Sequence, residues 1–191
     1  MFISYIFGTV GVGKSKHLYD AIYLSKKYRL ETVVIRPNIP NVYDNPKEIR
    51  AGKKKIYFEN IFYYPGTLKI SKSTSPIFVQ HSHLFDFDDL RELFMFFKSK
   101  WRYSSLVLFF GLEKNYKDEV YPHHKFLIEN ADYVEKYVTY CSSCKEYKAT
   151  HNQALYHGKE APILPKQFET KIIYEPRCSF CYIHPEQVSD F

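Results

Sequence analysis

The N-terminus holds the feature that constrains the fold most, a glycine loop between an apolar run and an amphipathic segment. Residues 8–15 read Gly-Thr-Val-Gly-Val-Gly-Lys-Ser, which matches the pattern G-x-x-x-x-G-K-[ST] at every defined position. The apolar run 2–7 predicts a buried strand, and residues 14–28 predict a helix. A strand, a glycine loop and a helix in this order are typical of the first unit of an α/β nucleotide-binding domain.

This loop predicts a site for the phosphates of a nucleoside triphosphate. Gly8, Gly11 and Gly13 allow backbone N–H groups to turn toward phosphate oxygens, and the helix N-terminus adds a favourable dipole. Lys14 is expected to reach the β and γ phosphates, and the Ser15 hydroxyl to bind Mg²⁺. The alternative is a chance glycine-rich turn. The motif indicates binding and does not name a reaction.

The rest of the first two thirds of the chain alternates apolar runs with helical patterns. We predict a polar loop at 38–52 and a β-hairpin at 53–71 that turns at Pro65-Gly66. Further strands are predicted at 32–35, 76–80, 106–110 and 134–140, and helices at 89–98 and 123–132. This alternation favours an α/β domain over residues 1–138, with a mainly parallel sheet covered by helices on both faces.

All four cysteines stand in two C-x-x-C pairs, which are Cys141 with Cys144 and Cys178 with Cys181. Four thiolates at this spacing predict a closed, tetrahedral and structural Zn²⁺ site in a small subdomain at 139–191. Two unrelated pairs of thiols are the alternative. His151 and His157 are rival ligands that we interpret as loop histidines. The segment 145–177 is held at both ends by this site and is a candidate substrate lid.

Charge and targeting signals limit the partners. The net charge of +6 over 191 residues suits nucleotides and nucleic acids alike. No secretory or membrane-spanning segment is recognisable, so we expect a cytoplasmic protein without a membrane partner. Short lysine runs at 26–27 and 53–55 are usually solvated surface, which makes nucleic acid an improbable partner.

Several segments together resemble the zinc-containing thymidine kinases. The glycine loop at the N-terminus and the paired cysteines near the C-terminus follow that family's arrangement. The ending Tyr174-Glu175-Pro176-Arg177-Cys178, with Cys181-Tyr182 after it, is the most specific match. Weaker matches lie at 37–43, at 49–52, in the Leu-Phe-Phe-Gly-Leu run of 108–112 and at Ala131-Asp132.

The resemblance implies a P-loop domain with a zinc ribbon and a "lasso" loop, assembled as a homotetramer. It implies transfer of the ATP γ-phosphoryl group to the 5′-hydroxyl of deoxythymidine. Tyr174 matches the family's lasso tyrosine, and Tyr116 and Tyr121 fall near two family phenylalanines, so all three are candidate nucleoside-binding residues.

The departures from the family fall on its chemistry. The family's D-E-x-Q-F run, with a metal-shell Asp and a base Glu, is matched here by the run 80–85, Gln-His-Ser-His-Leu-Phe. His81 therefore stands at the base position, and Glu113 after the 106–110 strand is a second candidate for catalysis. Further departures fall at Pro40, at Val42, at His151-Asn152 and near 165–167. His123-His124 is interpreted as a solvent-facing loop pair, with a metal or phosphate contact as the alternative.

Three functions remain open. The first is a working deoxynucleoside kinase that uses ATP, Mg²⁺ and structural Zn²⁺, with His81 or Glu113 replacing the base. The second is a catalytically inactive pseudo-kinase that binds or sequesters nucleotides. The third, a P-loop ATPase with a nucleic-acid-binding ribbon, is disfavoured because the third core strand lacks the acidic residue that most such ATPases need.

Overall fold

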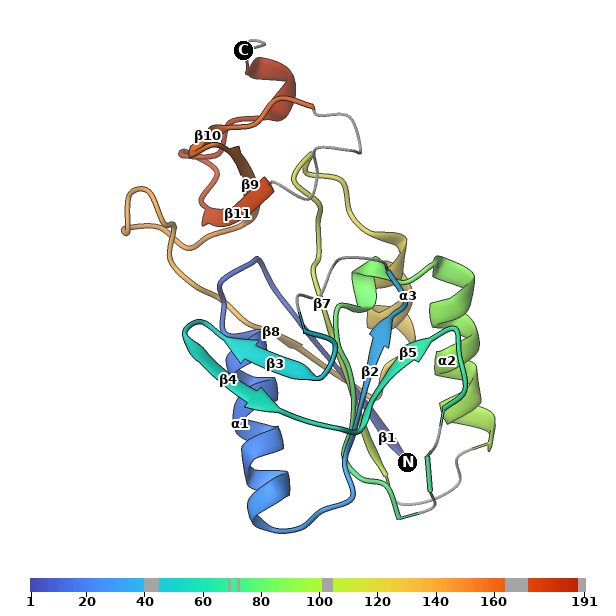
Figure 1. The fold of residues 1–191 in the computed structure, drawn as a ribbon. Coiled ribbons are helices and arrows are strands. Elements are labelled where there is room, and N and C mark those ends of the chain that lie inside the picture. Colours follow the sequence, from blue (N-terminus) through green and yellow to red (C-terminus); the bar gives the residue numbers. More distant parts are fainter. Residues whose placement is uncertain (40–44, 69, 72, 101–104, 164–171, 189–191) are drawn as a thin grey trace. The chain divides into compact units, whose positions relative to one another are not determined.

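The computed structural model describes residues 1–39, 45–68, 70–71, 73–100, 105–163 and 172–188 (Figure 1). The chain divides into two compact units. The first unit comprises Met1–Phe7, Gly13–Gly111 and Pro122–Glu135, and the second comprises Gly8–Val12, Leu112–Tyr121 and Lys136–Phe191. The boundary at residue 138 that the sequence suggests stays a prediction. Pro40, Val42 and the 165–167 positions lie outside the described residues.

The first unit is built on a six-stranded sheet in the order β5-β2-β6-β7-β1-β8. The pairs β1–β7, β6–β7, β2–β6 and β2–β5 are parallel, so the carboxyl ends of these strands meet at one edge. The strands are β1 (Phe2–Phe7), β2 (Val33–Pro37), β5 (Ile61–Tyr64), β6 (Ile77–Val79), β7 (Leu106–Gly111) and β8 (Tyr133–Lys136).

Helices cover the two faces of this sheet (Figure 1). Alternate strand residues such as Ile3, Tyr5 and Phe109 pack in one core with Leu93 and Phe97 of α2 (Phe87–Lys100), and α3 (Pro122–Asn130) adds Leu127. The intervening positions face α1 (Lys14–Lys27), where the His17 and Phe110 rings contact each other. The strands are thus buried on both faces, which confirms the predicted α/β class.

The segment between β2 and β6 differs from the prediction. The polar loop expected at 38–52 contains β3 (Glu48–Ala51), which pairs antiparallel with β4 (Lys54–Tyr57). The hairpin expected at 53–71 is wrong, because Ile61–Tyr64 forms β5 and joins the main sheet parallel to β2. The β3–β4 hairpin contacts α1 instead, with Ile49 fully buried. The apolar residues before Pro65-Gly66 therefore predicted one half of a hairpin, although they pair with β2.

The second unit contains a three-stranded antiparallel sheet in the order β10-β9-β11. Its strands are β9 (His151–Tyr156), β10 (Lys159–Glu160) and β11 (Ile172–Arg177). They occupy much of the segment 145–177, which we expected to be a loop. A cysteine pair flanks this segment at each end, so the strands and the cysteines form one substructure. Whether part of it closes over a substrate stays a prediction.

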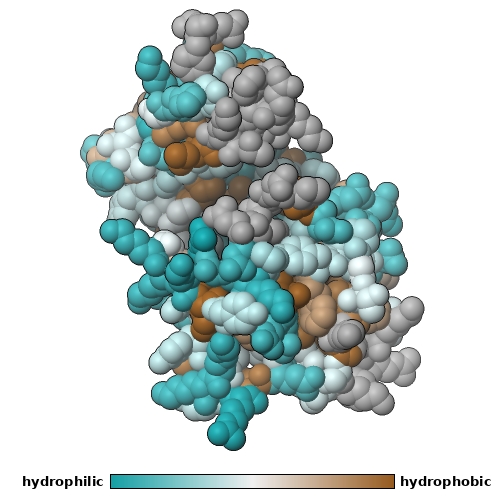
Figure 2. Space-filling view, viewed as in Figure 1, coloured by the Kyte–Doolittle hydropathy of each residue, from teal (hydrophilic) through white to brown (hydrophobic). Residues whose placement is uncertain are grey.

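On the face shown in Figure 2, hydrophobic residues form small separate areas between hydrophilic ones. The large apolar side chains concentrate instead in the core, where Ile22, Val34 and Leu90 have no exposed surface. Within the described parts of the chain, no helix is long and apolar enough to cross a bilayer.

Candidate functional site

The glycine loop has a backbone that only glycine adopts without strain. Gly8, Gly11 and Gly13 have φ angles of +148°, +73° and +97°. A Cβ atom on Gly8 would lie 2.3 Å from the carbonyl oxygen of Tyr137, so this position also excludes a side chain sterically. The backbone at these three positions therefore requires glycine, and the binding of phosphate by the loop stays a prediction.

A buried asparagine that the sequence reading did not assign to the site holds the loop's first half. Asn152 on β9 is 3% exposed. Its Oδ1 accepts a hydrogen bond from the Val10 N–H at 2.8 Å, and its Nδ2 donates to the Lys114 carbonyl oxygen at 2.7 Å. One side chain thus ties the glycine loop to the segment after β7. No motif marks such an asparagine, because its role appears only when these three segments meet.

Lys14 and Ser15 occupy the first turn of α1. Gly13 is the N-cap residue, and its carbonyl oxygen accepts the His17 N–H at 2.9 Å. N–H groups in the first helical turn have no partner within their own helix and are suited to anions. Burial lowers the pKa of the Lys14 ammonium to about 7, because the charged form loses solvation. A bound phosphate would supply the negative charge that favours the ammonium form.

A buried arginine lies at the carboxyl end of β2, and the sequence reading did not single it out. Arg36 is 1% exposed. Its Nε donates to Oε1 of Gln80 at 2.9 Å, and its guanidinium nitrogens donate to the carbonyl oxygens of Pro46 (3.2 Å) and Glu48 (2.8 Å). Arg36 therefore connects β2, the residue after β6 and the start of the β3–β4 hairpin.

Two histidines follow β6. The His81 backbone is left-handed, with φ 55°, at the start of a short 3₁₀ turn. Burial, together with the positive charges of Arg36 and Lys14, lowers the pKa of His81 to about 4. Burial also lowers the pKa of His83, as do His81 and Lys14. Both imidazoles are therefore neutral near neutral pH. We call the group Lys14, Arg36, Gln80, His81 and His83 the phosphate crevice.

Hydrogen bonds orient the Gln80 side chain between Arg36 and His81. Arg36 can only donate, so the Gln80 atom that it meets is the amide oxygen. The Gln80 amide nitrogen then lies 3.5 Å from Nε2 of His81, at the outer limit of a hydrogen bond. Arg36 therefore sets the orientation of the Gln80 amide, which lies next to the His81 ring.

The residues after β6 do not fit a P-loop magnesium site. P-loop proteins hold Mg²⁺ with the Ser or Thr of the loop and an acidic residue. Ser15 supplies the hydroxyl, but the matching positions after β6 are an amide, Gln80, and a neutral imidazole, His81. Mg²⁺ prefers charged oxygen ligands, which these two side chains do not provide.

The other catalytic candidate, Glu113, belongs to the second unit. Its carboxylate forms an ion pair of 2.7 Å with Lys136 of the same unit. Asp86, the acidic residue just before α2, caps that helix, because its Oδ1 accepts the Asp88 N–H at 3.0 Å. The charge of Lys14 thus acts on His81, whereas Glu113 and Asp86 have partners of their own.

The adjacent histidines of α3 are structural. The interpretation of His123-His124 as a solvent-facing loop pair is wrong, since both are buried in a helix at 7% and 6% exposure. Nε2 of His123 lies 2.9 Å from the Phe85 carbonyl oxygen, and Nδ1 of His124 lies 3.2 Å from the Tyr5 hydroxyl. Both side chains therefore connect α3 to neighbouring elements of the first unit.

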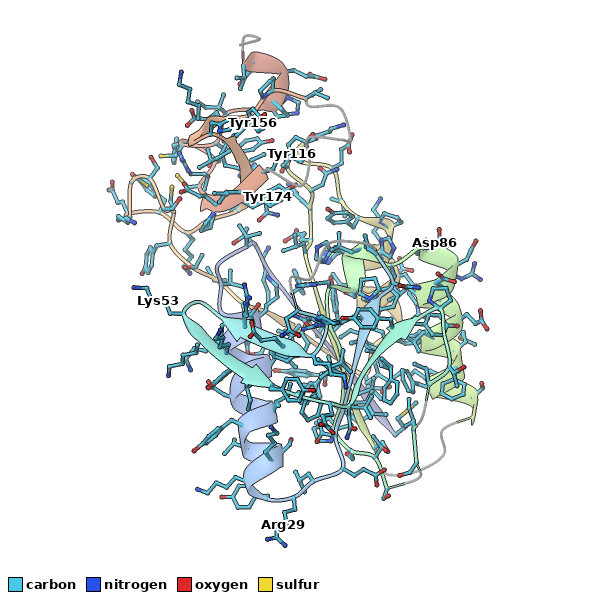
Figure 3. The ribbon with its side chains drawn as sticks, in the orientation of Figure 1. Arg29, Lys53, Asp86, Tyr116, Tyr156 and Tyr174 are labelled. Carbon is cyan, nitrogen blue, oxygen red and sulfur yellow. The ribbon has the colours of Figure 1, made fainter. Side chains whose placement is uncertain are left out.

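Two of the three tyrosines proposed for nucleoside binding lie together in the second unit (Figure 3). The rings of Tyr116 and Tyr174 are 6.3 Å apart, and Tyr116 packs with Ala154 and Ala161. The Tyr116 hydroxyl is buried, and no hydrogen-bond partner for it is found among the described residues. Tyr121 lies elsewhere in the segment after β7, where its backbone N–H donates to the Glu113 carbonyl oxygen at 3.1 Å. We call Tyr116, Tyr174, Ala154 and Ala161 the tyrosine cluster.

The four cysteines converge on one point. Their sulfur atoms all lie within 4.8 Å of one another, and Sγ of Cys144 is 3.8 Å from Sγ of Cys178. Four thiolates at the Zn–S distance of about 2.3 Å would place neighbouring sulfurs about 3.8 Å apart, so the group fits a tetrahedral zinc ion. Burial opposes ionisation of Cys141, but backbone N–H groups of the two pairs outweigh it and lower its pKa to about 6.

Comparisons with known proteins agree with this architecture. A family model described as thymidine kinase matches residues 1–182, which include the glycine loop and all four cysteines. Two curated proteins named thymidine kinase, from two strains of Chloroflexus aurantiacus, are each 25% identical to the chain over 185 residues. Each alignment covers 94% of this chain and 93% of the relative.

Proposed function

Because the chain belongs to the thymidine kinase family, we propose that it binds ATP and transfers the γ-phosphoryl group to the 5′-hydroxyl of deoxythymidine or a related deoxynucleoside. The observation that carries this proposal is the position of Lys14. It follows a loop with positive φ at all three glycines and lies close enough to His81 for its charge to shift that residue's pKa. A cytoplasmic location and a homotetramer go with the proposal, as the resemblance implies.

The phosphate crevice supplies the electrostatic part of the reaction. Phosphoryl transfer depends mainly on positioning and on stabilising charge over the transferred group. The Lys14 ammonium and the Arg36 guanidinium place two positive charges at the carboxyl ends of the central strands, where α/β folds bind their ligands. Because Arg36 is buried, water screens its charge weakly. These two residues would stabilise the terminal phosphates.

The tyrosine cluster supplies a surface for the nucleoside. The two rings offer aromatic faces on which a base can pack, and the Tyr116 ring is held by packing against Ala154 and Ala161. A buried hydroxyl without a protein partner costs free energy unless a ligand or water satisfies it. A nucleobase oxygen or nitrogen would satisfy the Tyr116 hydroxyl.

We expect this chain to catalyse the reaction more slowly than other family members, because it has no strong proton acceptor assigned to the 5′-hydroxyl. His81 stands where the family has its base, yet its pKa of about 4 makes it a weak proton acceptor. Loss of general-base catalysis typically costs about 10²–10⁴-fold in rate. We expect turnover reduced by this order relative to relatives that keep the carboxylate.

A second candidate function is nucleotide binding without turnover. The residues after β6 favour it, because Gln80 is an amide and His81 is a neutral imidazole near neutral pH, so neither supplies the carboxylate that the family uses. In that case the protein would retain or sequester nucleotides.

The deciding experiment incubates the purified zinc-loaded protein with γ-labelled ATP and deoxythymidine and separates the products by thin-layer chromatography. The kinase proposal expects labelled thymidine monophosphate, which disappears in Lys14→Met. Bound ATP without labelled product above the Lys14→Met background would contradict the kinase proposal and establish the binding function.

A further inference from the structure

The first half of the glycine loop is held by the part of the chain that carries the cysteines. Gly8–Val12 belong to the second unit, whereas Gly13 and Lys14 belong to the first. The glycine motif does not contain the residues that support Gly8–Val12, so this support comes from elsewhere in the second unit. Two residues that provide it, Asn152 and Pro176, stand in the strands β9 and β11.

Asn152 and Pro176 contact neighbouring residues of the loop. They lie directly opposite each other in the antiparallel pair of β9 and β11. The Asn152 Oδ1 accepts a hydrogen bond from the Val10 N–H at 2.8 Å. Gly11, the next residue, lies beside the Pro176 ring, where a Cβ on Gly11 would be in van der Waals contact with Cγ of Pro176 at 3.5 Å. Two successive loop residues thus rest on one cross-strand pair.

This cross-strand pair is itself fixed by other segments of the second unit. Ser142 donates from its N–H and from its hydroxyl to the Pro176 carbonyl oxygen, at 2.8 and 3.0 Å. Ser142 directly follows Cys141, so the Pro176 backbone is tied to the first cysteine pair. Asn152 is 3% exposed and donates from Nδ2 to the Lys114 carbonyl oxygen at 2.7 Å. A shift of Asn152 would leave a buried amide unpaired, which costs free energy, so its position is well determined.

We propose that Asn152 is a positioning residue for phosphate binding, which holds Val10 and with it the first half of the glycine loop in the conformation that receives a nucleotide. The proposal rests on nucleotide binding at the glycine loop, as proposed above. Asn152 does not touch the phosphates in it and acts through the Val10 N–H. A loop that is ordered beforehand loses less conformational entropy when its ligand binds, so the ligand binds more tightly.

The test compares two buried amides of one strand. Asn152→Leu removes both hydrogen bonds of Asn152 at similar side-chain size. The matched control is Gln153→Met. Gln153 is 1% exposed, and its amide bonds the Ile183 N–H at 2.9 Å and the Ala154 carbonyl oxygen at 3.4 Å. Adjacent strand residues point to opposite faces of a sheet, so Gln153 faces away from the loop. A merely structural role of Asn152 predicts equal effects of the two substitutions.

Two readouts follow the loop in the zinc-loaded protein. Hydrogen–deuterium exchange without ligand reports the order of residues 8–12, and isothermal titration calorimetry reports the Kd for ATP. In Asn152→Leu we expect faster exchange over residues 8–12 and a Kd about tenfold higher. In Gln153→Met both should stay as in wild type. An unchanged Kd in Asn152→Leu, or an equal rise in both variants, would overturn the proposal.

Zinc content and urea denaturation check that both variants are folded. If Asn152→Leu does not retain zinc, Asn152→Ala takes its place, because the smaller side chain leaves room for water at the two backbone groups. The same two readouts then decide, with the same signs expected.

The outcomes separate this inference from the proposed function. If wild type binds ATP and yields thymidine monophosphate while Asn152→Leu binds ATP equally well, the inference fails and the kinase stands. If wild type binds ATP without product, and only the Asn152 variant binds it more weakly, the inference stands and the kinase fails. A wild type that binds no ATP overturns both.

Discussion

The four-cysteine group and the phosphate crevice are opposite in charge. In the group, four thiol sulfurs converge within 4.8 Å, and backbone N–H groups favour the thiolate of Cys141. In the crevice, a lysine and a buried arginine converge on neutral imidazoles. One site is built for a cation and the other for an anion. The comparison teaches that the cysteines of a family's metal site can be kept while the residues proposed for its nucleotide site change.

The largest effect, on zinc retention and folding, is expected when one cysteine of the four-cysteine group is replaced. Structural zinc contributes about 10–16 kcal/mol to the folding of small metal domains, so Cys178→Ser should abolish zinc retention and unfold the β9–β11 sheet. Zinc content by mass spectrometry and far-ultraviolet circular dichroism check this. Ser179→Ala, at the exposed neighbouring position, is the control and should keep full zinc content. A folded Cys178→Ser protein without zinc would mean that the metal site is dispensable.

The next largest effect, on the free energy of unfolding, is expected when Arg36 is replaced. Arg36→Met removes the guanidinium donor from the Glu48 carbonyl oxygen and the Gln80 amide oxygen, while the Tyr63 hydroxyl still donates to the Pro46 carbonyl oxygen. We expect a cost of about 3 kcal/mol in the free energy of unfolding. Urea denaturation measures it.

The matched control for this variant is Arg50→Met. Arg50 is exposed and pairs with the Glu48 carboxylate, so its loss should cost under about 1 kcal/mol. Equal destabilisation by the two substitutions would show that the burial of Arg36 contributes nothing to the crevice.

The smallest effect is expected in the pH dependence of ATP affinity. The pKa of Lys14 is lowered to about 7 by burial, so the free protein loses this positive charge as the pH rises through that value. ATP affinity should therefore fall about fivefold between about pH 7 and about pH 8. His81, with a pKa of about 4, stays neutral throughout this range. Calorimetric titration across the interval checks the slope, and a flat profile would mean that Lys14 does not meet the phosphates.

The local patterns of the sequence predicted the parts of the fold that depend on them. The glycine loop predicted β1 and α1, and the apolar runs predicted β2, β6 and β7, because buried parallel strands read as continuous apolar stretches. β5 was wrongly paired, because its short run next to Pro65-Gly66 reads equally well as half of a hairpin.

The candidate site was only partly predictable, for a different reason. The glycines, Lys14 and the cysteines belong to motifs whose spacing is fixed by local geometry. Arg36 and Asn152 belong to none, and each acts by joining segments that lie far apart in the sequence. A charged residue inside a strand gives no signal of its partners until the fold is known. The orientation of the Gln80 amide is likewise set by Arg36.

The most direct test of the account is the ATP affinity of Lys14→Met beside that of Lys27→Met. Both lysines belong to α1, at its first and last residues. The account predicts that Lys14→Met weakens ATP binding by about a hundredfold, since a partly buried charge next to the phosphates is lost, while Lys27→Met leaves it unchanged. Unchanged ATP affinity in Lys14→Met, with the protein still folded, would contradict it.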